Sequence, residues 1–198
     1  MKKKVAVFVS GGGTNLQTLL DAQQSGVLKS GEIALVISSK EGVYALERAK
    51  NAGVPAFSIP RAEMALDAFE AQCTALLEEY QIDYIVLAGF LTILSEGFIK
   101  RFPNRMINVH PALIPAFCGK GYYGLRVHEA ALERGVKLTG ATVHFVNEVC
   151  DGGPIIAQKA VEVLPGDTPE TLQKRVMEQA EWVLLPRALE MVCGGSLH

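Results

Sequence analysis

The chain has 198 residues, of which 49% are hydrophobic and 20% are charged, the balance of an ordinary globular protein. This length fits one domain with a sizeable core, so we expect a single domain over residues 1–198. The net charge of −2 provides no broad cationic field for nucleic acid or an anionic membrane. We therefore expect neither of them as a partner.

The cysteines point to a reducing compartment. The four of them are far apart and form no C-x-x-C pair, which fits reduced thiols and argues against a cysteine-based metal site. The apolar run near the N-terminus is too short for a signal peptide, and no apolar run in the chain approaches the roughly 20 residues of a membrane span. These features predict a cytoplasmic protein.

Strand-like and helix-like patterns alternate along the first part of the chain. Val5–Val9 is a continuous apolar run rich in β-branched residues, which is typical of strands covered on both faces. Helical spacing of apolar residues follows it, and Thr14 or Asn15 is the expected cap of that first helix. Further runs like the first are residues 33–37, 84–88 and 106–109. This alternation predicts an α/β fold with a doubly wound, mostly parallel sheet.

The pattern changes in the last third of the chain. Lys137–Val146 and Ile155–Val163 are predicted strands, joined by a turn-rich link that lets them pair as antiparallel neighbours at the far side of the sheet. A final helix is predicted from Thr168 or Pro169 to about Met191, because threonine is a good cap and proline suits the first helical position.

A glycine-rich loop, Ser10–Asn15, joins the first strand to the first helix. Backbone amides at such a junction point outward, and the helix dipole favours an anion there. The loop lacks the lysine of a Walker motif, and Leu16 occupies the third glycine position of the dinucleotide fingerprint. A phosphate site is the favoured interpretation, and a tight turn without a ligand is the alternative.

The strand that ends at Pro111 carries a candidate catalytic pair. Because side chains alternate along a strand, Asn108 and His110 project to one face, while Ile107 and Val109 project to the other. An amide and an imidazole side by side can stabilise an oxyanion, and histidine can also move a proton near neutral pH. A hydrogen-bonded structural histidine is the alternative.

Two further polar features follow downstream. Thr142 and His144 share one face of the next predicted strand, and Asp151 lies in a glycine-rich loop after it. A carboxylate beside an imidazole fixes its tautomer and raises its basicity. A plain Asp-Gly turn is the alternative for Asp151. The spacing of these residues matches no usual metal-ligand pattern, so no metal is expected.

These motifs, taken in order, resemble a known family. They are Ser10–Leu16, Leu87–Phe90, Asn108–Pro115, Gly140–Val146 and Asp151–Gln158. Together they resemble the phosphoribosylglycinamide formyltransferases, the folate-dependent enzymes of purine synthesis. The Asn-x-His-Pro motif with a downstream Asp-x-Gly is common to formyl-folate transferases and hydrolases, and the glycine-rich loop narrows the resemblance to the glycinamide ribonucleotide branch.

The resemblance implies a reaction and an architecture. The formyl donor would be 10-formyltetrahydrofolate, a co-substrate, and the acceptor would be the amine of glycinamide ribonucleotide in IMP biosynthesis, without a metal. The fold would be the Rossmann-like formyltransferase fold, with a phosphate-binding half at about 1–104 and a folate-binding and catalytic half at about 105–198. The protein would be a monomer or a homodimer.

The resemblance also implies roles for individual residues. Asn108 and His110 would stabilise the tetrahedral oxyanion, and Asp151 would orient His110 and a proton-relaying water, with Thr142 and His144 in support. The ribonucleotide would be held by Gly12, Gly13, Thr14, Asn15 and Glu181. The folate would contact Leu91, Thr92, Ile93, Leu94, Val146, Asn147, Glu148, Val149 and Cys150.

Two parts of the sequence differ from the family pattern, and one arginine is a candidate for a family role. Thr92 stands where many relatives have an arginine that contacts the folate tail, so that contact is absent or is supplied elsewhere. Arg61 is a candidate for an arginine that helps to hold phosphate. The segment Cys118–Gly124 is longer than in some relatives, and we interpret it as a mobile lid or substrate loop, with a surface loop as the alternative.

Other activities fit the sequence less well. A formyltetrahydrofolate hydrolase usually carries an additional N-terminal regulatory domain, whereas this chain begins at the first strand. A methionyl-tRNA formyltransferase needs a C-terminal domain and a basic surface for tRNA. A non-catalytic phosphate-binding domain would not need Asn108, His110 and Asp151.

Overall fold

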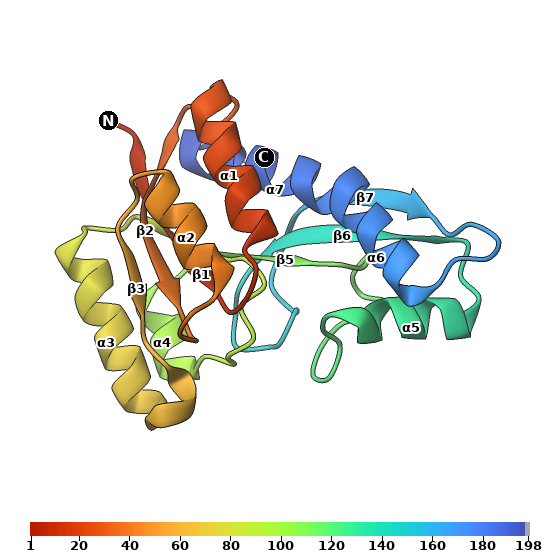
Figure 1. The fold of residues 1–198 in the computed structure, drawn as a ribbon, viewed down its shortest axis with the longest axis horizontal. Helices are drawn as coiled ribbons and strands as arrows, with labels where there is room; N and C mark the ends of the chain where they lie inside the picture. Colours follow the sequence, from red (N-terminus) through yellow and green to blue (C-terminus); the bar gives the residue numbers. More distant parts are fainter. Residues whose placement is uncertain (197–198) are drawn as a thin grey trace.

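The computed structural model describes residues 1–196, which form a seven-stranded sheet with helices on both faces (Figure 1). The spatial order is β3-β2-β1-β4-β5-β6-β7. The first five strands of this order run parallel, β6 is antiparallel to β5, and β7 is antiparallel to β6, which confirms the predicted fold class. The strands are β1 Lys3–Val9, β2 Gly31–Ser38, β3 Ala56–Ser58, β4 Tyr84–Leu87, β5 Met106–His110, β6 Leu138–Phe145 and β7 Ile155–Glu162.

The helices form two layers, one on each face of the sheet. Val5, Val7 and Val9 of β1 enter the core beneath one layer, whereas Ala6 and Phe8 enter the core beneath the other. The first layer contains α1 Thr14–Ser25, α2 Tyr44–Asn51, α5 Leu125–Arg134, α6 Pro169–Val176 and α7 Trp182–Gly194. The second contains α3 Leu66–Glu79 and α4 Glu96–Arg101. Burial on both faces explains why β1 is apolar throughout.

The predicted final helix begins as expected and contains an irregularity. The Thr168 hydroxyl accepts a hydrogen bond from the Thr171 amide, and the Thr171 hydroxyl accepts one from the Thr168 amide, which completes a capping box. A π-helical turn, Met177–Glu181, separates α6 from α7. Such turns are rare and frequently occur at functional sites, and this one places Glu181 in the interior.

The first helix is capped differently from the prediction. Neither Thr14 nor Asn15 caps α1; Gly13 occupies the cap position with a φ of 71° and makes no side-chain hydrogen bond. The left-handed conformation is accessible to glycine at little cost, so the backbone itself makes the turn into the helix. β3 and α4 were not predicted, because segments of three and six residues are too short to show a clear period.

The topology brings the candidate functional segments to one edge of the sheet. The glycine-rich loop follows β1, Leu91–Leu94 follows β4, and His110 ends β5, so all three lie at the carboxyl ends of parallel strands. Open α/β sheets bind their ligands at this edge. None of the helices in residues 1–196 has the length and apolar character to cross a membrane.

Candidate active site

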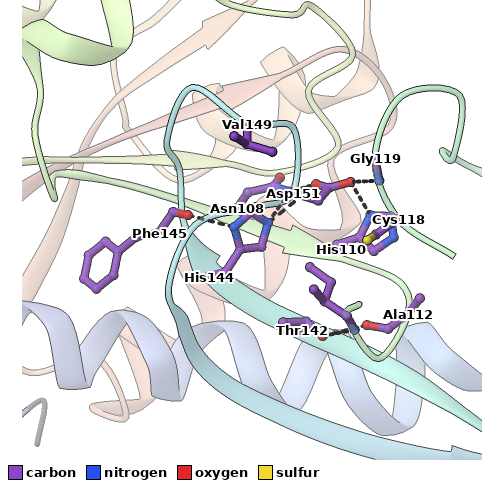
Figure 2. Close-up of polar contacts among 12 residues, drawn as sticks. Asn108, His110, Ala112, Cys118, Gly119, Thr142, His144, Phe145, Val149 and Asp151 are labelled. Carbon is purple, nitrogen blue, oxygen red and sulfur yellow. Dashed lines mark hydrogen bonds and ion pairs between the residues drawn. The ribbon is translucent and has the colours of Figure 1, made fainter. Parts of the chain in front are cut away.

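The pairing of β5 with β6 assembles the polar side chains. In the antiparallel register, Asn108 lies opposite His144 and His110 lies opposite Thr142. Ile107 on β5 points to the core on the other face, together with Val109. The predicted alternation along β5 is therefore confirmed, and the two strands together present four polar side chains (Figure 2).

Asp151 joins this group from the loop between β6 and β7. Its Oδ2 lies 3.5 Å from Nδ1 of His110 and its Oδ1 lies 3.5 Å from Nε2 of His144. Nδ2 of Asn108 is 3.4 Å from the same Oδ1. The amide of Gly119 donates to Oδ2 at 2.8 Å, so both carboxylate oxygens have partners (Figure 2).

These contacts decide the charge state of Asp151. Its side chain is only 10% exposed, and burial alone would raise the pKa of the carboxyl. The neighbouring side chain of His144, the hydrogen bond from the Gly119 amide and the nearby charge of His110 together outweigh burial and hold the pKa of Asp151 below its usual range. The cluster therefore contains a fixed carboxylate at neutral pH.

The backbone around Asp151 is specialised for this position. Asp151 has a φ of 54°, which is uncommon for a residue other than glycine. A Cβ on Gly153 would collide with the carbonyl oxygen of Phe145, so the loop lies too close to β6 for any side chain there. Backbone strain of this kind clusters at functional sites.

His110 has an oxygen acceptor at each ring nitrogen. Its Nε2 lies 2.8 Å from the carbonyl oxygen of Phe117, which can only accept, so Nε2 carries a proton. Its Nδ1 faces the carboxylate of Asp151. An imidazolium can donate to both oxygens, whereas a neutral ring can donate to only one. The two contacts thus fix the orientation of the His110 ring.

His144 is oriented by its own strand. Its Nδ1 lies 2.8 Å from the carbonyl oxygen of Phe145 and therefore donates to it. Its Nε2 then faces the side chain of Asn108, with Nδ2 of that amide at 3.2 Å. The carboxamide of Asn108 is in this way held between His144 and Asp151, with its nitrogen toward both.

The segment between β5 and α5 is tied to the site at several points. The Thr142 hydroxyl donates to the carbonyl of Ala112 at 2.7 Å and accepts from the amide of Ile114 at 3.1 Å. Phe117 and Gly119 contact His110 and Asp151, as described above. This segment therefore forms a wall of the site. In the segment Cys118–Gly124, Tyr122 and Tyr123 are exposed, as expected for a surface loop, and the role of this segment as a mobile lid or substrate loop stays a prediction.

The glycine-rich loop presents an open backbone surface. A Cβ on Gly11 or Gly12 would meet no atom within 4 Å, so these positions border free space. A Cβ on Gly13 would lie 2.6 Å from Cβ of Ala45, because α2 packs tightly on this turn. The first amides of α1 lack partners within the helix, and together with the open glycines they form a surface suited to an anion.

Asn15 and Glu181 are brought together although they are far apart in sequence. Nδ2 of Asn15 donates to Oε2 of Glu181 at 2.8 Å, and both side chains are buried. Burial raises the pKa of Glu181, and the hydrogen bond from Asn15 opposes that rise. Oδ1 of Asn15 is buried and has no hydrogen-bond partner among the described residues.

The segment after β4 lies beside the glycine-rich loop. The hydroxyl of Ser10 accepts from the amide of Leu91 at 3.0 Å and lies 2.7 Å from the hydroxyl of Ser39. Leu91 and Ile93 are exposed. Leu94, in contrast, is buried among the side chains of the second core. The exposed side chains provide an apolar surface at the sheet edge.

The loop before Asp151 contributes a similar surface. Val149 is 64% exposed, and its amide donates to Oδ1 of Asn147 at 3.0 Å, which shapes the turn. Val146 is anchored by a hydrogen bond from its amide to the carbonyl of Met106. Glu148 and Cys150 complete this turn.

Arg61 lies in a short 3₁₀ turn near the end of β2. Its amide donates to the carbonyl of Ser39, and its guanidinium donates to the carbonyl of Met64. A role of Arg61 in phosphate binding stays a prediction, as does the consequence of having Thr92 in place of an arginine.

Some groups of the site carry no sequence signal. Phe117 and Gly119 act through a backbone carbonyl and an amide, which any residue type provides. The hydroxyls of Ser10 and Ser39 connect two loops, and neither serine was predicted to have a role of its own. Within residues 1–196, no group of three or more His, Cys, Asp or Glu side chains is arranged to hold a metal ion.

Comparison with known proteins places this geometry in a family. The formyl transferase family model matches residues 3–189. Phosphoribosylglycinamide formyltransferase of Arabidopsis thaliana, a chloroplastic protein, is 41% identical over 180 residues, covering 90% of this chain and 61% of its own length. The trifunctional purine biosynthetic protein adenosine-3 of Homo sapiens is 43% identical, covering 100% of this chain but 19% of its own length.

Solved structures show the same likeness. Glycinamide ribonucleotide transformylase 1 from Symbiobacterium toebii superposes with a TM-score of 0.91 and 41% identity, covering 98% of this chain and 89% of that one. The corresponding protein from Geobacillus kaustophilus gives a TM-score of 0.90 at 37% identity, with 98% and 100% covered. The chain thus spans less than two thirds of its curated relatives but most of these structures. The shared fold and the match over residues 3–189 confirm the resemblance seen in the motifs, and the chain belongs to the formyl transferase family.

Proposed function

We propose that the protein transfers the formyl group of 10-formyltetrahydrofolate to the amine of glycinamide ribonucleotide, a step of IMP biosynthesis. The observation that carries the proposal is the cluster of Asn108, His110 and Asp151 at the sheet edge that also carries the glycine-rich loop. The names of the relatives supply the acceptor, glycinamide ribonucleotide, and the transferred formyl group, and they favour transfer over hydrolysis.

In the proposed reaction, the amine attacks the formyl carbon and the formyl oxygen becomes an oxyanion. Nε2–H of His110 would donate to this oxyanion and stabilise it, assisted by the amide of Asn108. In the structure this N–H is bonded to the carbonyl of Phe117. The formyl oxygen would replace that carbonyl, so the segment Ala112–Gly119 would shift when the folate binds.

Collapse of the intermediate breaks the bond between the formyl carbon and N10 of the folate. The attacking amine loses one proton and N10 gains one, so the transfer needs no net proton. Asp151 would orient a water that relays this proton, and its ionised carboxylate beside His110 and His144 supports this role. Thr142 supports the site through its bonds to the segment after β5.

The two substrates would approach along the same sheet edge. The ribonucleotide phosphate would lie on the amides of Gly12, Gly13, Thr14 and Asn15, and its sugar would lie near Glu181, which Asn15 contacts. The folate would lie against Leu91–Leu94 and Val146–Cys150, where Leu91, Ile93 and Val149 are exposed.

An assay with and without the acceptor tests the proposal. Purified protein with both substrates is expected to release tetrahydrofolate and formylated ribonucleotide, with little release when glycinamide ribonucleotide is left out. Equal release in both cases would identify a 10-formyltetrahydrofolate hydrolase. Release in neither case would contradict an activity on this donor.

Other expectations from the sequence stay predictions. They are a single formyltransferase domain over residues 1–198 with halves at about 1–104 and 105–198, a cytoplasmic location, a monomeric or homodimeric state, and no nucleic acid, membrane or metal partner.

A further inference from the structure

Arg48 on α2 is bound to the glycine-rich loop. Its Nε donates to the carbonyl of Gly12 at 2.8 Å, and its Nη1 donates to Oε1 of Gln17 at 3.0 Å. The ring of Tyr44 lies beneath the guanidinium, with its centroid 4.7 Å from Cζ. Contacts on three sides therefore fix the orientation of this side chain.

The contact with Gly12 determines where the next amide points. In a planar trans peptide, the carbonyl and the N–H point in opposite directions. Because the Gly12 carbonyl is turned toward Arg48, the N–H of Gly13 is turned away from it. Similarly, the amide of Ala45 donates to the carbonyl of Gly11 at 3.3 Å, which turns the N–H of Gly12 away from α2.

Both outward amides are available for a ligand. Within residues 1–196, neither the Gly12 nor the Gly13 amide donates to a protein acceptor. The space beside Gly11 and Gly12 is open as well. The carbonyls of the two peptides are therefore engaged by α2, and their amides face the free space that the proposed phosphate would occupy.

Consecutive glycines do not by themselves hold these two peptides in this orientation. Glycine peptides rotate easily, and a rotated peptide would present a carbonyl oxygen to the phosphate, which would repel it. Arg48 opposes this rotation with a charge-assisted hydrogen bond. It also places a positive charge beside the loop.

We propose that Arg48 is a positioning residue for the phosphate of the ribonucleotide. It holds the Gly12–Gly13 peptide so that the Gly13 amide faces the anion, and α2 thereby becomes part of the substrate site. This inference rests on the proposed function, since it assigns the loop to the ribonucleotide.

The proposal is tested by measuring binding with Arg48→Met, Arg48→Lys and the matched control Lys50→Met. Lys50 is an exposed cation of the same helix, so its loss removes the same charge from α2. Calorimetric titration with glycinamide ribonucleotide should give a Kd about ten-fold or more higher for Arg48→Met, because a charge-assisted hydrogen bond that orders the site is lost. Arg48→Lys should recover part of the affinity, and Lys50→Met should bind like the unchanged protein.

Further readouts separate positioning from a merely structural role. The KM for 10-formyltetrahydrofolate and the kcat at saturating ribonucleotide should stay within about two-fold of the unchanged protein in Arg48→Met. An unchanged Kd in that variant, or an equal loss of folate affinity, would overturn the proposal. Failure of the unchanged protein to bind the ribonucleotide would instead contradict the proposed function, so the two failures are distinguishable.

Discussion

The glycine-rich loop and the catalytic cluster lie at one edge of the sheet, but they are built from different parts of the chain. The loop is a continuous stretch, Ser10–Asn15, and it offers mainly backbone amides. The cluster uses side chains from β5, β6 and a distant loop, with Asn108 and Asp151 separated by 43 positions. The loop depends on conformation, whereas the cluster depends on the chemical identity of its side chains.

This difference predicts that the two regions respond to substitution in different ways. In the cluster, an isosteric change that alters only a charge should abolish activity and leave the fold intact. In the loop, a single added methyl group should act through the backbone, either on stability or on ligand access, according to the position.

The largest effect is expected for Asp151→Asn. The amide has the shape of the carboxylate but no charge, so it can no longer stabilise an imidazolium at His110 or orient a proton-relaying water. Turnover should fall by about three orders of magnitude or more, while the KM for the ribonucleotide changes little. Steady-state kinetics with both substrates measures this.

Asp167→Asn is a suitable control for that variant. Asp167 is also a paired carboxylate, with Arg175 at 2.5 and 2.6 Å, but it precedes α6 at the far end of β7. The Asp167→Asn variant should be less stable than the unchanged protein, but its turnover should be the same at a temperature where both are folded. Near-normal turnover of Asp151→Asn would remove this residue from the mechanism.

The next effect separates two neighbouring glycines. Gly13→Ala should lower the free energy of unfolding by about 3 kcal/mol, because it combines a left-handed backbone with overpacking. The Gly13 φ is 71°, and an added Cβ would lie 2.6 Å from Cβ of Ala45. Urea denaturation measures this loss.

Gly12→Ala is the matched comparison. The φ of Gly12 lies outside the left-handed region and an added Cβ would meet no protein atom, so stability should change by less than about 0.5 kcal/mol. Its methyl group would enter the proposed phosphate space, so the KM for the ribonucleotide should rise about ten-fold with the KM for folate unchanged. Equal changes of the two variants in the free energy of unfolding and in the KM for the ribonucleotide would contradict separate roles of Gly13 in backbone conformation and of Gly12 in ligand access.

The same contrast explains what could be predicted from the sequence. The shared face of Asn108 and His110 followed from alternation along a strand, and the antiparallel pair β6–β7 followed from two adjacent strand patterns. Asp151 was identified by its motif, but its contact with two histidines depends on a loop conformation that no local pattern encodes.

The remaining features depend on tertiary packing. The cap of α1 at Gly13 arises because α2 packs against the turn, and the π-helical turn that buries Glu181 breaks an otherwise regular helical period. The contributions of Phe117 and Gly119 come from main-chain atoms, which residue identity does not reveal. Position along a strand was therefore predictable, and contacts between distant loops were not.

The last prediction concerns the pH dependence of stability. His128 on α5 is fully buried, and neither ring nitrogen has a hydrogen-bond partner among the described residues. Burial, assisted by the charge of His110, lowers the pKa of His128 to about 4. The folded protein therefore holds this ring neutral, and stability is full above the unfolded value of about 6.5 and falls as the pH drops toward 4.

The free energy of unfolding should decrease by about 2 kcal/mol between pH 7.5 and pH 5 on account of this one group. Asp151 does not add to this loss, because a lowered carboxyl pKa costs stability only below the unfolded value of about 4. His128→Leu removes the titrating ring and fills a similar volume, so urea denaturation of that variant should show a smaller decrease over the same interval. An identical decrease in both proteins would mean that protonation elsewhere governs acid stability.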